Sequence, residues 1–129
     1  MAQQPDAFSY AVVRVVPDIE REEFLNAGLI LFCRPRRFLV ARTRLDEAAL
    51  TALRRDCDTD GIREQLRLVE RIAAGEPDAG QIAALEQSER FHWLTTPRST
   101  LIQPGPIHAG VTDDPAATFD HLWRVLVAR

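Results

Sequence analysis

A single arginine within an apolar run near the start of the chain could organise a polar pocket. Arg14 lies in the stretch 8–16, whose other residues are mostly β-branched or aromatic. Burying a guanidinium without a partner is strongly destabilising, so this side chain must reach water or a carboxylate. We predict that Glu22 or Glu23, just before the next apolar run, supplies that carboxylate.

Two interpretations of this arginine remain open. In the functional one, Arg14, Glu23 and Asn26 form a pocket in which Gly28 leaves room, because glycine in a central strand marks a bulge or the close approach of another backbone or ligand. In the structural one, a buried ion pair fixes the strand register. We favour the structural interpretation, since ion pairs inside sheets also perturb charged groups.

A second group of arginines could bind an anion, and it comprises Arg34, Arg36, Arg37, Arg42 and Arg44. Guanidinium groups match the oxygens of phosphate and carboxylate. Nucleic-acid binding would also need exposed aromatic rings between the charges, and only Phe38 is interleaved. Residues 56–89 carry a net charge of −6 and could neutralise this patch internally, which is the interpretation we favour.

The segment 92–114 contains the residue types of acid–base and nucleophilic sites. Its candidates are Arg98, His108 and Asp113, which could join the pocket of Arg14. However, the chain has no HExxH, GxSxG or GKS/T motif, and its three histidines lack the spacing of metal ligands. We therefore expect no metal and no cofactor, lean towards a protein that is not an enzyme, and name no catalytic residue.

The elements that must position these residues follow from hydrophobic periodicity. Three strands are predicted, over 8–16, 24–33 and 37–42, and Pro17 is expected to end the first. Their short connections favour an antiparallel meander. Helices are predicted from the Asp46 cap to residue 53, over 60–74 before Gly75, over 82–86, and from the Asp114 cap onwards. Residues 91–94 and 99–103 are predicted as short strands. The fold class is therefore α+β, a small antiparallel sheet of three to five strands packed against three or four helices.

Length and composition limit the class of protein. The chain has 129 residues, 46% hydrophobic and 27% charged, which indicates a single globular domain over 1–129. No apolar run approaches the ~20 residues that span a bilayer, and the first residues lack an export pattern. We expect a cytoplasmic protein without a membrane partner. Cys33 and Cys57 are predicted to stay unpaired, with Cys33 buried at a strand end.

The run Tyr10-Ala-Val-Val-Arg14-Val-Val-Pro17-Asp18, followed by Arg21-Glu-Glu23-Phe24-Leu-Asn26-Ala-Gly28, resembles a bacterial family known as domain of unknown function 3037. The resemblance continues through 36–42, 93–98 and 108–115. The family type has glycine where this chain has Glu22 and favours valine where it has Ala27. The resemblance implies a small bacterial cytoplasmic protein, without an assigned activity. Its members are often encoded beside toxin-type protein kinases related to persistence kinases.

Three functions follow as expectations. The favoured one is an accessory or regulatory domain that binds another protein, for which the resemblance suggests a kinase of the persistence type. The second is a small enzyme or binding domain for an anionic, phosphate-type ligand, in which Arg14 and Arg98 grip the anion, Glu23 or Asp113 acts as base and His108 as acid. The third is nucleic-acid binding through residues 34–44, which we favour least. The sequence does not decide whether the chain forms a homo-oligomer.

Overall fold

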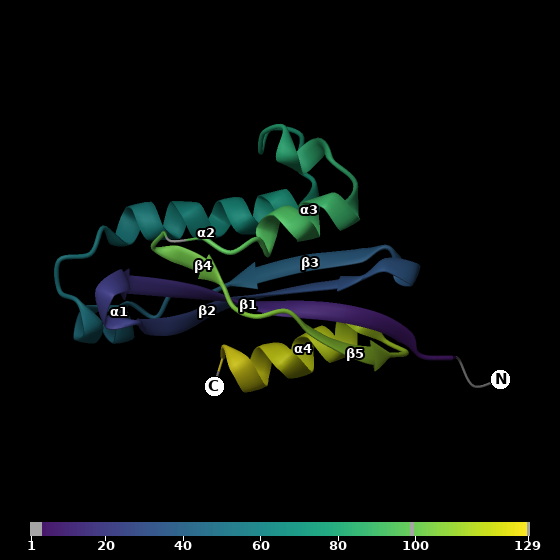
Figure 1. The fold of residues 1–129 in the computed structure, drawn as a ribbon, viewed down its shortest axis with the longest axis horizontal. Coiled ribbons are helices and arrows are strands. Elements are labelled where there is room, and N and C mark those ends of the chain that lie inside the picture. Colours follow the sequence, from purple (N-terminus) through teal and green to yellow (C-terminus); the bar gives the residue numbers. More distant parts are fainter. Residues whose placement is uncertain (1–3, 99, 129) are drawn as a thin grey trace.

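An antiparallel sheet lies between two layers of helices in the computed structural model, which describes residues 4–98 and 100–128 (Figure 1). The strands β1 (Asp6–Asp18), β2 (Glu23–Cys33) and β3 (Phe38–Thr43) form the predicted meander. Two further strands, β4 (Ile102–Pro104) and β5 (His108–Thr112), pair with β1 at successive stretches of its other edge. All pairings are antiparallel, so the predicted α+β class is confirmed.

The helices cover both faces of this sheet. Helices α2 (Thr59–Ala74) and α3 (Gln87–Leu94) lie on one face and α4 (Pro115–Leu126) on the other, while α1 (Glu47–Leu53) sits at one end (Figure 1). Short 3-10 turns over Ile19–Arg21 and Arg34–Arg36 close the two hairpins, and another over Ile82–Ala84 precedes α3. No helix in the described ranges is both long and apolar enough to span a bilayer.

Strand alternation gives the molecule two cores. On the α2 side, Val13, Val15 and Ile30 of the sheet pack against the buried stripe of α2, which comprises Ile62, Leu66, Val69, Ile72 and Ala73. On the α4 side, Leu29 and Leu31 pack against Phe119. Because neighbouring residues of β2 point to opposite faces, this central strand belongs to both cores.

The helix ends follow the predicted capping. Asp46 accepts a hydrogen bond from the Ala49 amide, and Asp114 accepts one from the Ala117 amide. Gly75 ends α2 in the left-handed conformation, with φ of +72°. Both cysteines are free, and Cys33 is fully buried at the end of β2 as expected.

Four local predictions differ from the structure. β1 continues past Pro17 to Asp18, because this proline lies at a register shift where no ladder hydrogen bond is required of it. Residues 91–94 are the end of helix α3 instead of a strand, and the helix predicted over 82–86 is only a 3-10 turn over Ile82–Ala84. The strand predicted at 99–103 is β4 at Ile102–Pro104, and Ser99 lies outside the described residues.

Candidate functional site

Arg14 is stabilised by an aromatic ring and not by the predicted carboxylate. Its guanidinium carbon lies 4.0 Å from the centre of the Phe24 ring, and Gly105 also lies beside the guanidinium, since a Cβ atom there would be 3.2 Å from this carbon. Glu23 pairs with Arg21 instead, at the hairpin tip. In the described part of the chain no carboxylate lies within 4 Å of Arg14, and its buried Nε has no hydrogen-bond partner. The predicted Arg14–Glu23 ion pair is therefore wrong.

Only Asn26 among the other predicted pocket residues lies beside Arg14. The two are paired across β1 and β2, and the Asn26 amide donates to the Leu126 carbonyl at the end of α4 (3.1 Å). Asn26 therefore caps a helix end. Gly28 accommodates the backbone of β3, since a Cβ atom there would lie 2.9 Å from the Arg42 carbonyl oxygen.

The remaining predicted pocket residues lie in separate places. His108 is exposed and stacks on Tyr10, with 5.1 Å between the ring centres. Asp113 is exposed in the turn before α4. Arg98 lies on the α2 side of the sheet, whereas Arg14 points to the α4 side by strand alternation. The structure thus brings Arg14 and Asn26 together and does not bring the others to them.

The predicted anion patch is divided among four surroundings. Arg36 pairs with Asp6 at 2.5 Å, an interaction that raises the pKa of its guanidinium. Arg42 pairs with Asp120 at 3.5 Å and lies over the Phe119 and Trp123 rings of α4. Asp6 and Asp120 both lie outside the acidic segment 56–89, which was expected to neutralise the patch. Several carboxylates of that segment instead form ion pairs with arginines of the same segment. Arg44 lines a small hollow beside α2.

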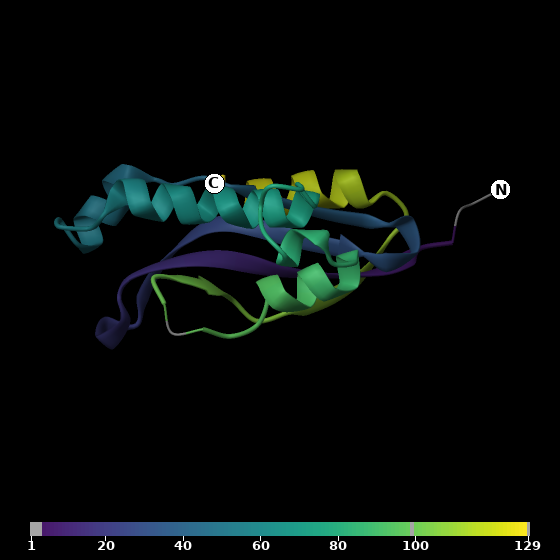
Figure 2. The ribbon, with the colours of Figure 1, turned by 90° about the horizontal axis from the view of Figure 1, so that it is seen from above.

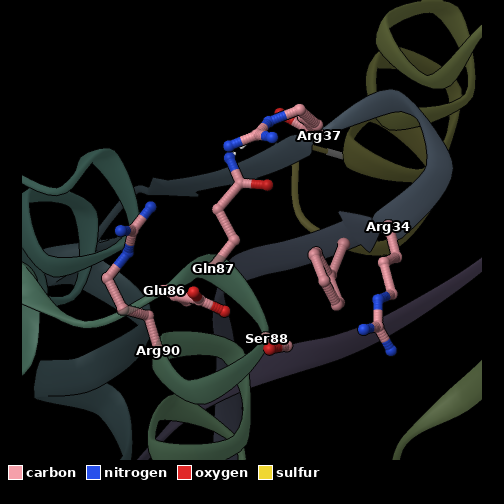
Figure 3. Close-up of a pocket in the computed structure, with 7 residues that line it drawn as sticks. Arg34, Arg37, Glu86, Gln87, Ser88 and Arg90 are labelled. Carbon is pink, nitrogen blue, oxygen red and sulfur yellow. Dashed lines mark hydrogen bonds between the residues drawn. The ribbon is translucent and has the colours of Figure 1, made fainter.

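Arg34 and Arg37 line a common cavity of about 480 Å³ with α3, hereafter the arginine pocket (Figure 3). Neither guanidinium lies within 4 Å of a carboxylate in the described ranges. The other lining residues are Phe32, Glu86, Gln87, Ser88 and Arg90. Arginine pairs free of acidic partners attract phosphate and carboxylate groups.

Backbone contacts hold this pocket in shape. The Gln87 side-chain amide donates to the Arg37 carbonyl (2.9 Å), which ties the β2–β3 turn to the start of α3 (Figure 3). Arg90 donates to the carbonyls of Leu85 and Ala73, so its charge is fixed at the edge of the pocket. Glu86 precedes α3 without capping it through its side chain. Sequence reasoning missed the residues 86–90 because they are remote from the arginine patch in the chain.

A second concavity, hereafter the apolar groove, has a volume of about 570 Å³ and runs beside α2. The chain leaving α3 turns towards the tip of the β1–β2 hairpin (Figure 2), and Arg98, Thr100 and Leu101 from this part of the chain line the groove. Ile19, Leu68 and Trp93 line the groove and remain 47%, 39% and 36% exposed. Leu68 lies beside the buried stripe of α2 and not within it. This exposed leucine was the feature of the sequence that could have indicated the groove.

Arg98 is the charged residue that faces the apolar groove from the described chain. It donates to the Trp93 carbonyl, and its guanidinium carbon lies 4.2 Å from the centre of that indole ring. Burial lowers the pKa of Arg98, and no carboxylate lies within 4 Å of it in the described ranges. The groove therefore combines apolar walls with a partly desolvated cation.

Within residues 4–98 and 100–128, no three His, Cys, Asp or Glu side chains lie close enough together to hold a metal ion. The arginine pocket and the apolar groove, both lined by described residues, differ in binding chemistry. The pocket offers positive charge around a polar cavity, and the groove offers apolar surface with one cation.

One protein family matches nearly the whole chain. Its model, described as "Protein of unknown function (DUF3037)", covers residues 10–127. No curated protein and no solved structure matches the chain.

Proposed function

The chain belongs to the family DUF3037, and from the apolar groove we propose that it is an accessory or regulatory domain that binds another protein. The observation that carries this proposal is the exposure of Ile19, Leu68 and Trp93 around one concavity. Contiguous exposed apolar side chains rimmed by polar residues mark interaction sites, because leaving them in water is unfavourable.

The groove also defines the chemistry of the partner. Trp93 and Arg98 are residue types that dominate binding energy at protein interfaces. Because the Arg98 guanidinium is partly desolvated and lacks an acidic partner, an incoming carboxylate would gain more from it than from an exposed arginine. We therefore expect a protein segment with apolar side chains and one aspartate or glutamate that reaches Arg98.

The first partner to test is a protein kinase of the persistence type. The family resemblance suggests this class, and we place the encounter in the bacterial cytoplasm. Free thiols at Cys33 and Cys57 are compatible with a reducing compartment.

Titration of the purified kinase into this protein, followed by calorimetry, tests the proposal with matched variants. Leu68→Arg inserts a charge into the groove wall and is expected to weaken binding at least about tenfold. Val125→Arg makes the same change at an exposed position of α4, on the other face of the sheet, and is expected to leave binding unchanged. Arg98→Glu is expected to weaken binding, and a partner glutamate changed to arginine should restore it.

Three results would count against this proposal. Equal binding by the wild type and Leu68→Arg would place the interface elsewhere. Loss of binding in both Leu68→Arg and Val125→Arg would indicate a folding effect. If sedimentation shows a dimer that Leu68→Arg dissociates, the occupant of the groove is a second copy of this chain.

A further inference from the structure

The arginine pocket has a shape and charge that the protein-binding proposal does not use. It lies between the β2–β3 turn and the start of α3, whereas the apolar groove lies between α2 and the segment after α3. Within the described chain, the two cavities share no lining residue. An inference from this pocket therefore stands independently of the proposed function.

The charges of the pocket favour an anion. Three arginines and one glutamate line it, and the guanidinium groups of Arg34 and Arg37 lie beyond 4 Å from every described carboxylate. The start of α3 faces the same space, and the Glu86 side chain does not cap its first turn. The partial positive charge of a helix N-terminus adds to that of the arginines.

The backbone of Arg37 supports a role in binding. Its φ of +51° lies in the left-handed region, which disfavours side chains other than glycine and asparagine. A glycine would fit this turn with less strain, yet the chain has an arginine whose guanidinium has no acidic partner. Strained residues cluster at binding sites, and Arg37, unlike the equally strained Glu22 of the other hairpin, lines a cavity.

The remaining lining residues restrict the body of the ligand. Phe32 supplies an aromatic wall, and its ring packs on Phe91 with centres 5.3 Å apart. The Glu86 carboxylate lies among the lining side chains (Figure 3), where it opposes a bare anion but can accept hydrogen bonds from hydroxyl groups. A volume of about 480 Å³ lies within the ordinary size of small-ligand pockets.

We propose that the arginine pocket binds a nucleoside monophosphate. The guanidinium groups of Arg34 and Arg37, which lie on different sides of the pocket (Figure 3), supply the positive charge for the phosphate, Phe32 contacts the base, and Glu86 accepts hydrogen bonds from the ribose hydroxyls. An extended nucleic acid fits less well, because Arg36 and Arg42 are paired with carboxylates and do not continue a basic stripe.

Amide NMR titrations with adenosine 5′-monophosphate, phenyl phosphate, inorganic phosphate and adenosine test the proposal. We expect shifts at Gln87 and Ser88, with affinity decreasing in that order and adenosine binding weakest. Arg34→Gln is expected to weaken binding of the monophosphate about tenfold or more, since a charge-assisted hydrogen bond is lost.

Two glycine variants separate binding from folding. Arg37→Gly removes a guanidinium while relieving the left-handed backbone, so it is expected to fold well and bind the monophosphate about tenfold more weakly. Glu22→Gly makes the same backbone change in the other hairpin and should bind like the wild type. Glu86→Ala is expected to strengthen the binding of inorganic phosphate. It should also reduce the preference of the pocket for the monophosphate over inorganic phosphate.

Several outcomes would overturn the proposal. They are equal binding by Arg37→Gly and Glu22→Gly, the absence of shifts at residues 86–88, and an unchanged preference in Glu86→Ala. If adenosine bound as tightly as its monophosphate, the arginines would not contribute to binding through the phosphate. A short single-stranded oligonucleotide that binds through Arg34 and Arg37 when the monophosphate does not would show that the ligand class is wrong.

Discussion

Glu22 and Arg37 occupy equivalent positions in the two hairpins of the sheet. Each follows a 3-10 turn and has a positive φ, +56° and +51°, and each donates its amide back to the first residue of that turn. This conformation costs a side-chain-bearing residue about 1 kcal/mol or more relative to glycine. Glycine in place of Glu22, which the family resemblance implies, would avoid this cost.

Glu22→Gly is therefore expected to raise the free energy of unfolding by about 1 kcal/mol, measured by urea denaturation. The control is Glu20→Gly, which removes the same charge two residues earlier, inside the 3-10 turn. Glycine there should lower stability by about 0.5 kcal/mol, because it adds only backbone freedom. If both variants were more stable than the wild type, the cause would be the loss of negative charge at the hairpin tip and not the relief of the left-handed backbone.

Arg14 shows that an aromatic ring can take the place of a carboxylate. Phe24 follows the predicted partner Glu23 by one residue, and its ring covers the guanidinium at 4.0 Å. Cation–π contacts contribute about 0.5–2 kcal/mol, with no need to desolvate a second charge. Sequence reasoning identified the anomaly correctly and assigned it the wrong neighbour, because the register shift between β1 and β2 after Val13 decides which residues of β2 face Arg14, and residue spacing does not reveal that shift.

Gly105 is the second boundary of the Arg14 site and gives a direct test. A Cβ atom at this position would lie 3.2 Å from the Arg14 guanidinium carbon. Gly105→Ala is expected to cost about 1–2 kcal/mol in the wild type and markedly less when Arg14 is alanine. A urea double-mutant cycle measures this coupling. Additive effects would show that the guanidinium does not fill the space beside Gly105.

At the scale of elements, β2 allows no extra atom at Gly28. A Cβ atom would lie 2.9 Å from the Arg42 carbonyl oxygen, 3.0 Å from the Thr43 methyl group and 3.1 Å from the Val13 Cβ. Gly28→Ala is expected to lower the free energy of unfolding by about 2–3 kcal/mol. Thr43→Ser should not rescue it, because the carbonyl of Arg42 belongs to the backbone of β3, which is held in place by its pairing with β2. Full rescue would locate the clash at the Thr43 methyl group instead.

The sequence predicted those elements whose signals are local and long. The three-strand meander, helix α2 with its Gly75 cap, and the Asp114 cap of α4 are confirmed. Helix α3 was missed because Phe91–Leu94 is a short apolar and aromatic run, which periodicity alone cannot assign. Its helical form buries Phe91 and Leu94 together against the α2-side core, a contact that depends on the whole sheet.

The candidate sites needed the structure for the same reason. Arg34 and Arg37 were recognised as able to bind an anion, but their distinction from Arg36 and Arg42 depends on Asp6 and Asp120. Asp120 lies 78 residues from Arg42 in the chain. Pairings over such distances are set by how α4 packs on the sheet, which residue spacing does not encode.

At the scale of the whole molecule, both candidate sites lie on the face of the sheet that carries α2 and α3. Helix α3 contributes to each, with Gln87 at the arginine pocket and Trp93 at the apolar groove. The α4 side instead forms a second core around Phe119. The two helical layers therefore differ in role. Helix α4 covers one face of the sheet, whereas α2 and α3 cover the other face and also contribute residues to the two cavities.

The two layers nevertheless share β2, from which we predict a single cooperative domain. Leu29 and Leu31 enter the α4-side core and Ile30 between them enters the other, so neither core can lose this strand alone. Trp93 reports on the α3 layer and Trp123 on the α4 layer. In Trp123→Phe and Trp93→Phe variants, urea transitions followed by the remaining indole and by far-UV circular dichroism should coincide. An earlier fluorescence transition of Trp123, with circular dichroism still native, would mean that α4 detaches first and that the cores are separate folding units.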